Sequence, residues 1–452
     1  MLFCGVDIGT SNIKIALYDA SGRKLYVSSA PTPRRQDAHG LVTDPARLVT
    51  ILRDMIVHAW RENGWGQKIA AISSTGVGED GFFVDEDLEP LNFAVPWFDQ
   101  RAKACADELA AMGLPHVRSG IQVESTRTIA KWFWHAKHTA LAQRAAYSWM
   151  SLTDYPLAVW SGMAFMSDTI ASRTGAFDPV RRYWVSEILD ACHSPSLPPV
   201  LMAGTEVGLM RDKAFLETGA VDQNTMLVAG GHDHPVAAHA IHNIRPEARV
   251  DSLGTANIIY ADAPHFEIPE LDPQIAFMAS IEGLGRLACL GVFEFNAEIN
   301  SFRGGIEGVH RILDFDRVPG EPGNLKGAPY FGARSVLEWS SFQALKIFGR
   351  LAELGVPSTP IYATGGWSRS LALMELRASM YGEAIYVPDE PELTVMGACL
   401  LAARPTSYQF ELDCGIAIVD PVAEWVNIYR ELALEAVMRE MQTSEVVSED
   451  NE

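Results

Sequence analysis

Two segments half a chain apart present the same residue types in the same order: an acid, a glycine, a hydroxyl residue and an asparagine. They are 6–12, VDIGTSN, and 250–257, VDSLGTAN. Apolar runs flank each segment, which predicts a strand, a tight turn and a second strand. Such a turn suits a phosphate, because glycine lets the backbone approach and amides and a hydroxyl can donate. An acid beside a phosphate requires a bridging cation such as Mg²⁺. One copy alone is typical of an ordinary hairpin turn, but the repeat predicts two related halves that bind a magnesium nucleotide.

A second candidate for chemistry is Asp233, in the segment 227–235, LVAGGHDHP. An apolar strand runs into two glycines, and Pro235 begins a helix, so Asp233 lies within a residue or two of the helix N-terminus. The helix dipole favours the ionised carboxylate there. Asp233 could therefore accept the proton of an attacking hydroxyl in phosphoryl transfer, as the general base. The alternative is that Asp233 only caps the helix.

Four histidines near Asp233 leave a metal site open as another interpretation. They are His232, His234, His239 and His242. A His-x-His pair is typical of metallohydrolases. Elsewhere the sequence supplies no matching set of carboxylates and histidines at recognisable spacing, so a kinase is favoured over a metal hydrolase.

A glycine loop at 364–370, TGGWSRS, follows an expected strand at 361–363 and precedes an expected helix. A helix N-terminus with small residues can bind a nucleotide.

A group of polar and aromatic residues between 76 and 101 is the candidate substrate region. Its members are Glu79, Asp80, Trp97, Asp99 and Arg101. The acids could accept hydrogen bonds from a polyol, and Trp97 could cover the carbon chain of a sugar. The alternatives are a solvated turn for Glu79 and Asp80, a core position for Trp97, and an ion pair between Asp99 and Arg101.

The bulk composition fits two soluble α/β domains. The chain has 452 residues, 48% of them hydrophobic, and a net charge of -21. That charge argues against a nucleic-acid or anionic-membrane surface. The six cysteines form no Cys-x-x-Cys pair, and no leader or membrane span is recognisable, so we expect reduced, mostly buried thiols and a cytoplasmic protein.

The periodicity predicts the elements that must position these residues. The N-terminal half should begin with strands at 2–8, 13–18 and 24–27, a helix from Asp44-Pro45 to Gly64, and a strand at 69–73. Residues 104–220 should be mainly helical, with core tryptophans at 132, 134, 149, 160 and 184. From 248 a strand-rich pattern resumes, with helices expected at 336–354 and 421–442 and a frayed acidic tail at 443–452.

Together these motifs resemble the FGGY family of carbohydrate kinases, within the actin and sugar-kinase ATPase fold, over nearly the whole chain. The likeness rests on 7–11 with Lys14, on Gly231-His232-Asp233, on 251–255, on Gly365-Gly366 with Ser368 and Ser370, and on Met396-Gly397-Ala398. The resemblance implies two actin-like (ribonuclease H-like) α/β domains, 1–243 and 244–442, with a nucleotide and substrate cleft between them. It implies ATP and Mg²⁺, with Asp7 and Asp233 at the metal and Asp233 as the base.

By the same resemblance, a set of small and charged residues would hold the nucleotide. They are Asp7, Gly9, Thr10, Ser11, Lys14, Gly254, Thr255, Gly365, Gly366 and Ser368. The chain departs from the family in a shortened segment after 329–334, PYFGAR, and in Trp367, where a third glycine is expected and where an indole could stack on or crowd the base. Residues 76–81, GVGEDG, replace the Gln-Met-His of xylulose kinases and the Arg-Glu of glycerol kinases, so the substrate stays open.

We therefore expect a kinase that transfers the γ-phosphoryl group of ATP to a small polyol or keto-sugar of four to six carbons. A regulatory protein of the same fold that has lost activity and a metal hydrolase are the alternatives. A homodimer is compatible with the sequence, which leaves the oligomeric state open.

Overall fold

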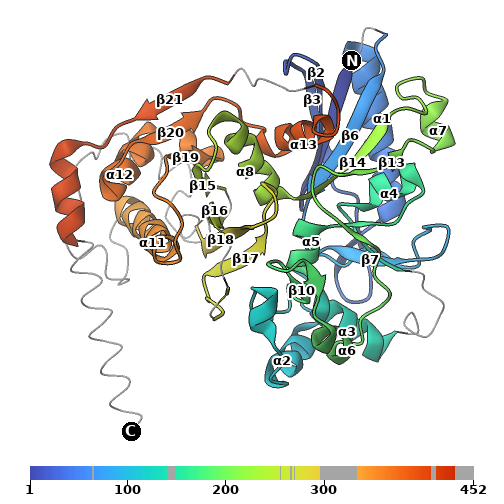
Figure 1. Ribbon diagram of the computed structural model, residues 1–452, viewed down its shortest axis with the longest axis horizontal. Helices are drawn as coiled ribbons and strands as arrows, with labels where there is room; N and C mark the ends of the chain where they lie inside the picture. Colours follow the sequence, from blue (N-terminus) through green and yellow to red (C-terminus); the bar gives the residue numbers. More distant parts are fainter. Residues whose placement is uncertain are drawn as a thin grey trace. The chain divides into compact units, whose positions relative to one another are not determined.

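The computed structural model describes residues 1–63, 66–139, 148–254, 256–264, 267–268, 270–295, 333–408 and 414–432. It divides into two compact units (Figure 1). The first comprises Met1–Pro246, Pro264–Ala288 and Glu392–Asp413, and the second comprises Glu247–Ala263, Cys289–Pro391 and Cys414–Glu452. The expected domains, 1–243 and 244–442, are each continuous in sequence. The observed units are not, because the segments 264–288 and 392–413 belong to the first unit.

A six-stranded sheet forms the centre of the first unit, in the order β13-β14-β6-β1-β2-β3. Its strands are β1 (Leu2–Ile8), β2 (Asn12–Asp19), β3 (Lys24–Pro31), β6 (Ile69–Gly76), β13 (Glu206–Leu209) and β14 (Met226–His232). The first three form an antiparallel meander, as the sequence predicts. Strands β1, β6 and β14 are parallel, and Ile8, Gly76 and His232 stand in register at their carboxyl ends. The segments that follow these three strands therefore leave from one edge of the sheet.

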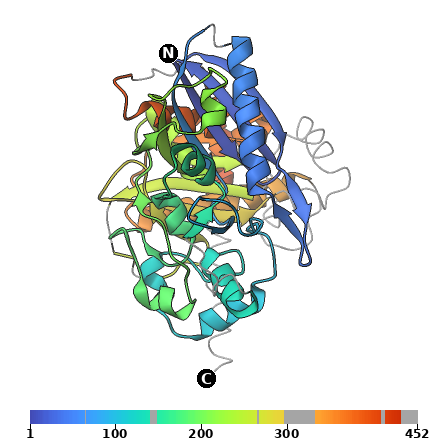
Figure 2. The same cartoon turned by 90° about the vertical axis from the view of Figure 1, so that its right-hand side faces the viewer.

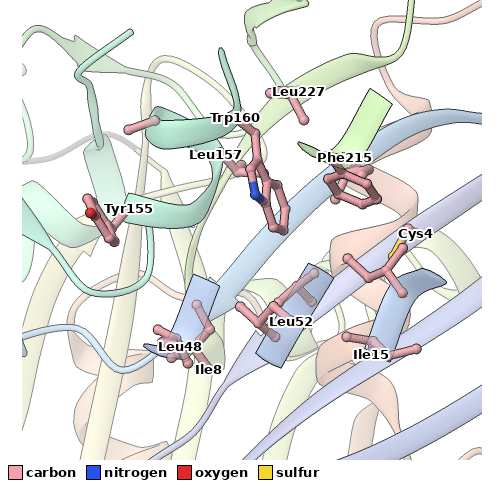
Figure 3. Packing of buried hydrophobic residues seen from close by; sticks show 14 of the residues in the cluster. Cys4, Ile8, Ile15, Leu48, Leu52, Tyr155, Leu157, Trp160, Phe215 and Leu227 are labelled. Atoms are coloured by element: carbon pink, nitrogen blue, oxygen red, sulfur yellow. The ribbon is translucent and has the colours of Figure 1, made fainter. Parts of the chain in front are cut away.

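Helix α1 (Pro45–Asn63) packs on this sheet, and Figure 2 shows it lying across the strands. Its apolar positions recur at helical spacing, so one face buries Leu48, Leu52 and Ile56. Figure 3 shows Leu48 and Leu52 near Ile8 of β1. Each fully buried leucine contributes about 1.5–3 kcal/mol by removal from water.

Short helices and strands fill the region between β6 and β14. The helices are α2 (Lys103–Ala111), η1 (His116–Ser119), α3 (Thr128–His138), α4 (Tyr155–Ser161), α5 (Asp168–Arg173), α6 (Ser186–Ala191) and α7 (Lys213–Leu216). The small strands of the first unit are β4 (Arg34–Gln36), β5 (Leu41–Thr43), β7 (Gly81–Val84), β8 (Ser148–Ser151), β9 (Met166–Ser167), β10 (Phe177–Asp178), β11 (Tyr183–Trp184) and β12 (Val200–Leu201).

The five tryptophans predicted to lie in the core do so. Four are buried and Trp184 is partly buried. The ring of Trp160 meets Phe215 edge-on, with centroids 5.2 Å apart (Figure 3).

Helix α13 (Leu393–Ala403) belongs to the first unit although it comes late in the chain. It packs against β1 and against α8 (Asp233–Ile244), the helix that begins at the candidate base. A Cβ atom on Gly397 would lie 2.0 Å from the carbonyl oxygen of Val236. Only glycine permits this approach, which explains the Met396-Gly397-Ala398 motif as a packing contact.

The second unit repeats the arrangement around β1. Strand β15 (Arg249–Leu253) is antiparallel to β16 (Ala256–Pro264) and parallel to β19 (Ile361–Thr364), as β1 is to β2 and β6. The order continues β19-β20-β21, with β20 (Ile385–Pro388) and β21 (Ile416–Val419). The two halves inferred from the sequence repeat are thus confirmed as related folds.

Further elements complete the two units. They are α11 (Ala333–Glu353), η4 (Gly366–Arg369) and α12 (Leu371–Tyr381) in the second unit, β17 (Ile275–Ala279) in the first, and β18 (Arg286–Glu294), which begins in the first unit's segment 264–288. The expected helix at 421–442 is present over 423–432, and its remainder, the tail at 443–452 and the helix end at Gly64 lie outside the described residues. The shortened segment at 329–334 lies almost wholly outside them.

Two expectations from composition can be compared with the structure. Five of the six cysteines are buried, Cys414 is partly exposed, and none is in a disulfide. Of the helices in the described ranges, none combines the length and apolar character needed to cross a membrane.

Candidate active site

Asp233 is the first residue of α8, as the sequence predicts. It follows β14, whose strand conformation ends at His232, and the amide of His234 donates to its Oδ1 over 2.7 Å. The side chain of Asp233 is 26% exposed, so solvent or a ligand can reach it. The Nε2 atoms of His232 and His234 lie 3.4 and 3.5 Å from Oδ1.

Asp7 lies one residue before the end of β1, on the same sheet edge as Asp233. It pairs across β2 with Lys14 and across β6 with Thr75. Burial raises the pKa of Asp7 to about 7, and repulsion by Asp233 and Glu392 adds to this effect while Lys14 opposes it. Two further carboxylates therefore disfavour the charged form of Asp7.

The turn after β1 leaves donors available. The amide of Gly9 closes the turn on the carbonyl of Asn12, over 3.0 Å. The amides of Thr10 and Ser11 donate no hydrogen bond to any residue that the structure describes. Two side chains stabilise the turn: the hydroxyl of Thr32 donates to the carbonyl of Gly9, and the guanidinium of Arg34 donates to the carbonyl of Thr10. This arrangement fits the predicted phosphate turn. The backbone donors available to a phosphate are the amides of Thr10 and Ser11, because the amide of Gly9 is used within the turn.

Lys14 forms an ion pair with Glu392, with Nζ and Oε2 2.7 Å apart. Glu392 directly precedes α13, and its side chain is 25% exposed against 33% for Lys14. Sequence reasoning found Lys14 and missed Glu392. The only signal was the position of Glu392 four residues before Met396-Gly397-Ala398.

The second copy of the motif is built differently. Asp251 is fully buried, and its Oδ2 lies 2.5 Å from Nη1 of Arg377 and 2.9 Å from the hydroxyl of Tyr381. Its Oδ1 accepts from Asn257 over 2.8 Å. The inference that the acid in both copies faces a cation-bridged phosphate is therefore wrong for Asp251, because arginine already neutralises it.

The remaining nucleotide candidates lie in the second unit. The amide of Gly254 donates to the carbonyl of Ala256, two residues ahead, whereas the amide of Gly9 donates to Asn12, three residues ahead, so the two turns close differently. Thr255 lies outside the described residues. Gly365 follows β19 with φ of 86°, and a Cβ there would lie 2.5 Å from the carbonyl oxygen of Leu253, so the position requires glycine.

The loop after β19 forms the short helix η4, which contains Gly366 and Ser368. The hydroxyl of Ser368 donates to the carbonyl of Gly365 over 2.8 Å and fixes the loop. Trp367 is 4% exposed and packs edge-on against Phe295 in the core of the second unit. The possibility that its indole stacks on a nucleotide base is therefore not supported, because the ring is already enclosed.

Glu79 follows β6 and is buried, not a solvated turn residue. Its Oε1 accepts from Arg127 over 3.0 Å and from Nη2 of Arg173 over 2.5 Å. Burial alone would raise the pKa of Glu79, but the two arginines outweigh it and lower the pKa. Lys131 donates to the Glu79 carbonyl over 2.9 Å. Sequence reasoning missed Arg127 and Arg173, because a lone arginine in a helical region carries no motif.

Asp80 is also buried, at 1% exposure. It accepts from the amide of Trp97 over 2.7 Å and lies 3.8 Å from Arg34. Burial raises the pKa of Asp80 to about 6 although Lys131 and Arg34 oppose the shift. Asp80 therefore links the loop after β6 to the loop that carries Trp97.

Trp97 is not a core residue. It is 39% exposed, and its Nε1–H donates to Oγ1 of Thr10 over 3.0 Å. A candidate substrate residue thus contacts the candidate phosphate turn directly.

Asp99 and Arg101 bind each other, which confirms the alternative of an ion pair. Arg101 donates to the two carboxylate oxygens of Asp99 over 2.8 and 2.9 Å and to Asp37 over 2.9 Å. The arginine and Asp99 side chains are about 5% and 4% exposed. The pair holds a loop together, and contact with a substrate stays a prediction.

Comparisons with known proteins identify the family and the fold. The model of the N-terminal domain of the FGGY family of carbohydrate kinases matches residues 2–239, and the model of its C-terminal domain matches 328–405. A xylulose kinase from Streptomyces rubiginosus is 28% identical over 435 residues, which cover 89% of this chain and 87% of that protein. A gluconokinase from Bacillus subtilis is 21% identical over 485 residues, covering 97% and 93%.

Solved structures show the same fold. The xylulose kinase from Rhodospirillum rubrum matches with a TM-score of 0.86 at 17% identity, over 99% of both chains. The gluconate kinase from Lactobacillus acidophilus matches with a TM-score of 0.84 at 18% identity, over 98% of both. The family match spans more than half of the chain. This protein therefore belongs to the FGGY family of carbohydrate kinases and is a sugar kinase, a phosphotransferase with an alcohol group as acceptor.

Proposed function

We propose that this kinase transfers the γ-phosphoryl group of ATP to a hydroxyl of a small polyol or keto-sugar, with Asp233 as the general base. The observation that supports the proposal is the shared sheet edge. The phosphate turn follows β1, the acids Glu79 and Asp80 follow β6, and Asp233 follows β14, and these strands are parallel and in register. Ligands of open α/β sheets bind at the carboxyl ends of strands.

The role of Asp233 follows from its surroundings. The helix N-terminus favours its negative charge, and the amide of His234 fixes Oδ1. A carboxylate held in this way can take the proton of a sugar hydroxyl as that oxygen attacks phosphorus. The side chain is partly exposed, so a substrate hydroxyl can reach it.

The donor set at this edge fits Mg²⁺. Asp7 and Asp233 offer carboxylate oxygens, the ligands that this cation prefers, and their mutual repulsion is what a cation relieves. Bound there, Mg²⁺ would neutralise phosphate charge during transfer. Asp7 would hold it, and Asp233 would share that task while acting on the acceptor hydroxyl.

The nucleotide phosphates are assigned to donors in each unit. In the first unit these are the free amides of Thr10 and Ser11, with Gly9 giving access and Lys14 adding a positive charge. In the second unit the assignment comprises Gly254, Thr255, Gly365, Gly366 and Ser368. Here the support is the glycine-dependent bend after β19.

The acceptor is assigned to the exposed face of Trp97 and the acids after β6. Because Oε1 of Glu79 is occupied by two arginines, Glu79 offers its other oxygen to a polyol. The hydrogen bond from Trp97 to Thr10 would place the acceptor next to the phosphate turn.

The proposal is tested by measuring ADP release with MgATP over a panel of four- to six-carbon polyols, ketoses and aldonates. Thermal shifts with a non-hydrolysable ATP analogue identify binding without turnover. One or a few acceptors should give both ADP release and a raised melting temperature. ADP release that is the same with and without every acceptor would contradict the proposal.

A further inference from the structure

Three consecutive residues at the start of α8 bring together the donors of a transition-metal site. His232, Asp233 and His234 each offer one ligand atom, and these atoms lie within 4.8 Å of one another. Both Nε2 atoms lie about 3.5 Å from the same carboxylate oxygen. Small changes in the side-chain torsions of these residues would let one cation contact all three ligand atoms.

The chemistry of this set differs from that of the proposed Mg²⁺ site. Imidazole nitrogens combined with a carboxylate suit Zn²⁺ and its neighbours in the first transition row, whereas Mg²⁺ takes oxygen ligands almost exclusively. Two histidines, one acid and water make a four-coordinate zinc site of the kind that keeps an open position. Phosphoryl transfer by Asp233 does not require either imidazole as a ligand.

We propose that His232, Asp233 and His234 bind Zn²⁺ or a similar transition-metal ion, and that the bound ion blocks Asp233. Unlike Mg²⁺ held mainly by Asp7, an ion fixed on Oδ1 by both imidazoles draws charge from the Asp233 carboxylate and lowers its capacity to accept the hydroxyl proton. The proposal that the ion binds depends only on the three side chains. The proposal that it inhibits the enzyme depends also on the proposed function, because it assumes that Asp233 is the base.

The surroundings predict an exchangeable ion and not a structural one. His232 is buried, and its Nδ1 has no hydrogen-bond partner among the described residues. Metal-bound histidines ordinarily donate their second ring N–H to a carboxylate or carbonyl, and loss of that partner weakens binding about 10- to 100-fold. His234 is 32% exposed, so an ion can enter and leave from solvent.

Calorimetric titration of ZnCl₂ into the chelator-treated full chain, without nucleotide or sugar, tests the binding. We expect one site on the wild type, at least ten-fold weaker binding in His234→Ala, and unchanged binding in His58→Ala, whose histidine is exposed on α1. The visible spectrum of added Co²⁺ should show the same pattern. Circular dichroism and melting confirm that the variants are folded.

Equal zinc affinity in the wild type and a folded His234→Ala would overturn the proposal, and so would the absence of a site. A separate arm measures ADP release at fixed excess Mg²⁺ with rising Zn²⁺. The wild type should lose activity at concentrations that spare His234→Ala, measured against each variant's own rate without zinc. If no acceptor of the panel supports turnover, the proposed function fails while the calorimetry still decides whether the ion binds.

Discussion

Lys14 and Glu392 lie 378 positions apart in the chain and form an ion pair with an Nζ to Oε2 distance of 2.7 Å. One residue belongs to the strand after the phosphate turn, and the other directly precedes α13. The pair ties the residue before α13 to the first unit, to which the packing of α13 on β1 and α8 assigns that late segment. It also sets Lys14 between two acids, because Asp7 stands opposite Lys14 in the β1–β2 register.

Replacing Lys14 by methionine should raise KM for ATP about 10- to 100-fold, since one charge-assisted contact of about 1.5–3 kcal/mol is lost. The melting temperature should change little, because a partly exposed ion pair contributes at most about 1 kcal/mol. Steady-state kinetics over an ATP range measure the effect, with Lys24→Met on β3 as the matched control. An unchanged KM for ATP would remove Lys14 from the nucleotide site.

The two acids of the sequence repeat should respond oppositely to substitution by asparagine. Asp251→Asn breaks a fully buried pair with Arg377 and should lower the free energy of unfolding by about 3–5 kcal/mol. Asp7→Asn removes a carboxylate whose charge burial disfavours, so it should leave stability equal or higher and abolish most activity. Denaturant unfolding and ADP release distinguish the two. Equal stability losses in both variants would show that the copies play the same part.

Trp97→Phe isolates the hydrogen bond to Thr10. The variant keeps an aromatic face and loses the Nε1–H donor. A net hydrogen bond of about 0.5–1.5 kcal/mol predicts a loss of about two- to ten-fold in kcat/KM for the acceptor. Trp97→Ala should lose more and chiefly raise KM for the acceptor. Wild-type kinetics in both variants would place the acceptor elsewhere.

A pH effect is expected at Glu282, which contacts the helix that carries Asp233. Its Oε1 lies 2.7 Å from Nδ1 of His239 and 3.4 Å from Nδ1 of His242. Burial alone would raise the pKa of Glu282, but the hydrogen bonds and charges of the two histidines outweigh it and lower the pKa.

A carboxylate whose pKa is lower in the folded state than in the unfolded state stabilises the fold at pH values above the unfolded pKa, which is about 4.5 for Glu282. This stabilisation is lost as the pH falls from 4.5 toward the lower pKa of the folded state. Glu282→Gln should therefore lower the free energy of unfolding by about 1–3 kcal/mol near pH 6, with the difference shrinking below pH 4.5. Urea unfolding at several pH values measures it, with the exposed Glu62→Gln on α1 as control. If the difference in unfolding free energy between the wild type and Glu282→Gln instead grows as pH falls below 4.5, the lowered pKa of Glu282 is contradicted.

Local patterns in the sequence were sufficient to predict the helices and strands and to select the candidate site residues that lie next to glycines. Apolar runs bounded by turn residues predicted β1 to β3, helical spacing predicted α1, and the repeated motif predicted a hairpin in each half. Asp233 at the start of α8 followed from two glycines before a proline-led helix.

Contacts between distant segments could not be predicted in the same way. Nothing near Glu79 in the sequence indicates Arg127 or Arg173, because each arrives from a separate helical region with no motif of its own. The same holds for Glu392 at Lys14, and for Arg377, which neutralises Asp251 and so changes the role of the second acid. A local motif gives the residue types at a turn, whereas the charge that faces them depends on tertiary packing.

The proposed function depends above all on Asp233 taking the proton of the acceptor hydroxyl. The most direct measurement is ADP release by Asp233→Asn with the best acceptor of the panel, beside calorimetric binding of the ATP analogue. We expect kcat to fall about 10²–10⁴-fold or more, with nucleotide affinity kept within a few-fold. Turnover within ten-fold of the wild type in a folded variant would contradict it.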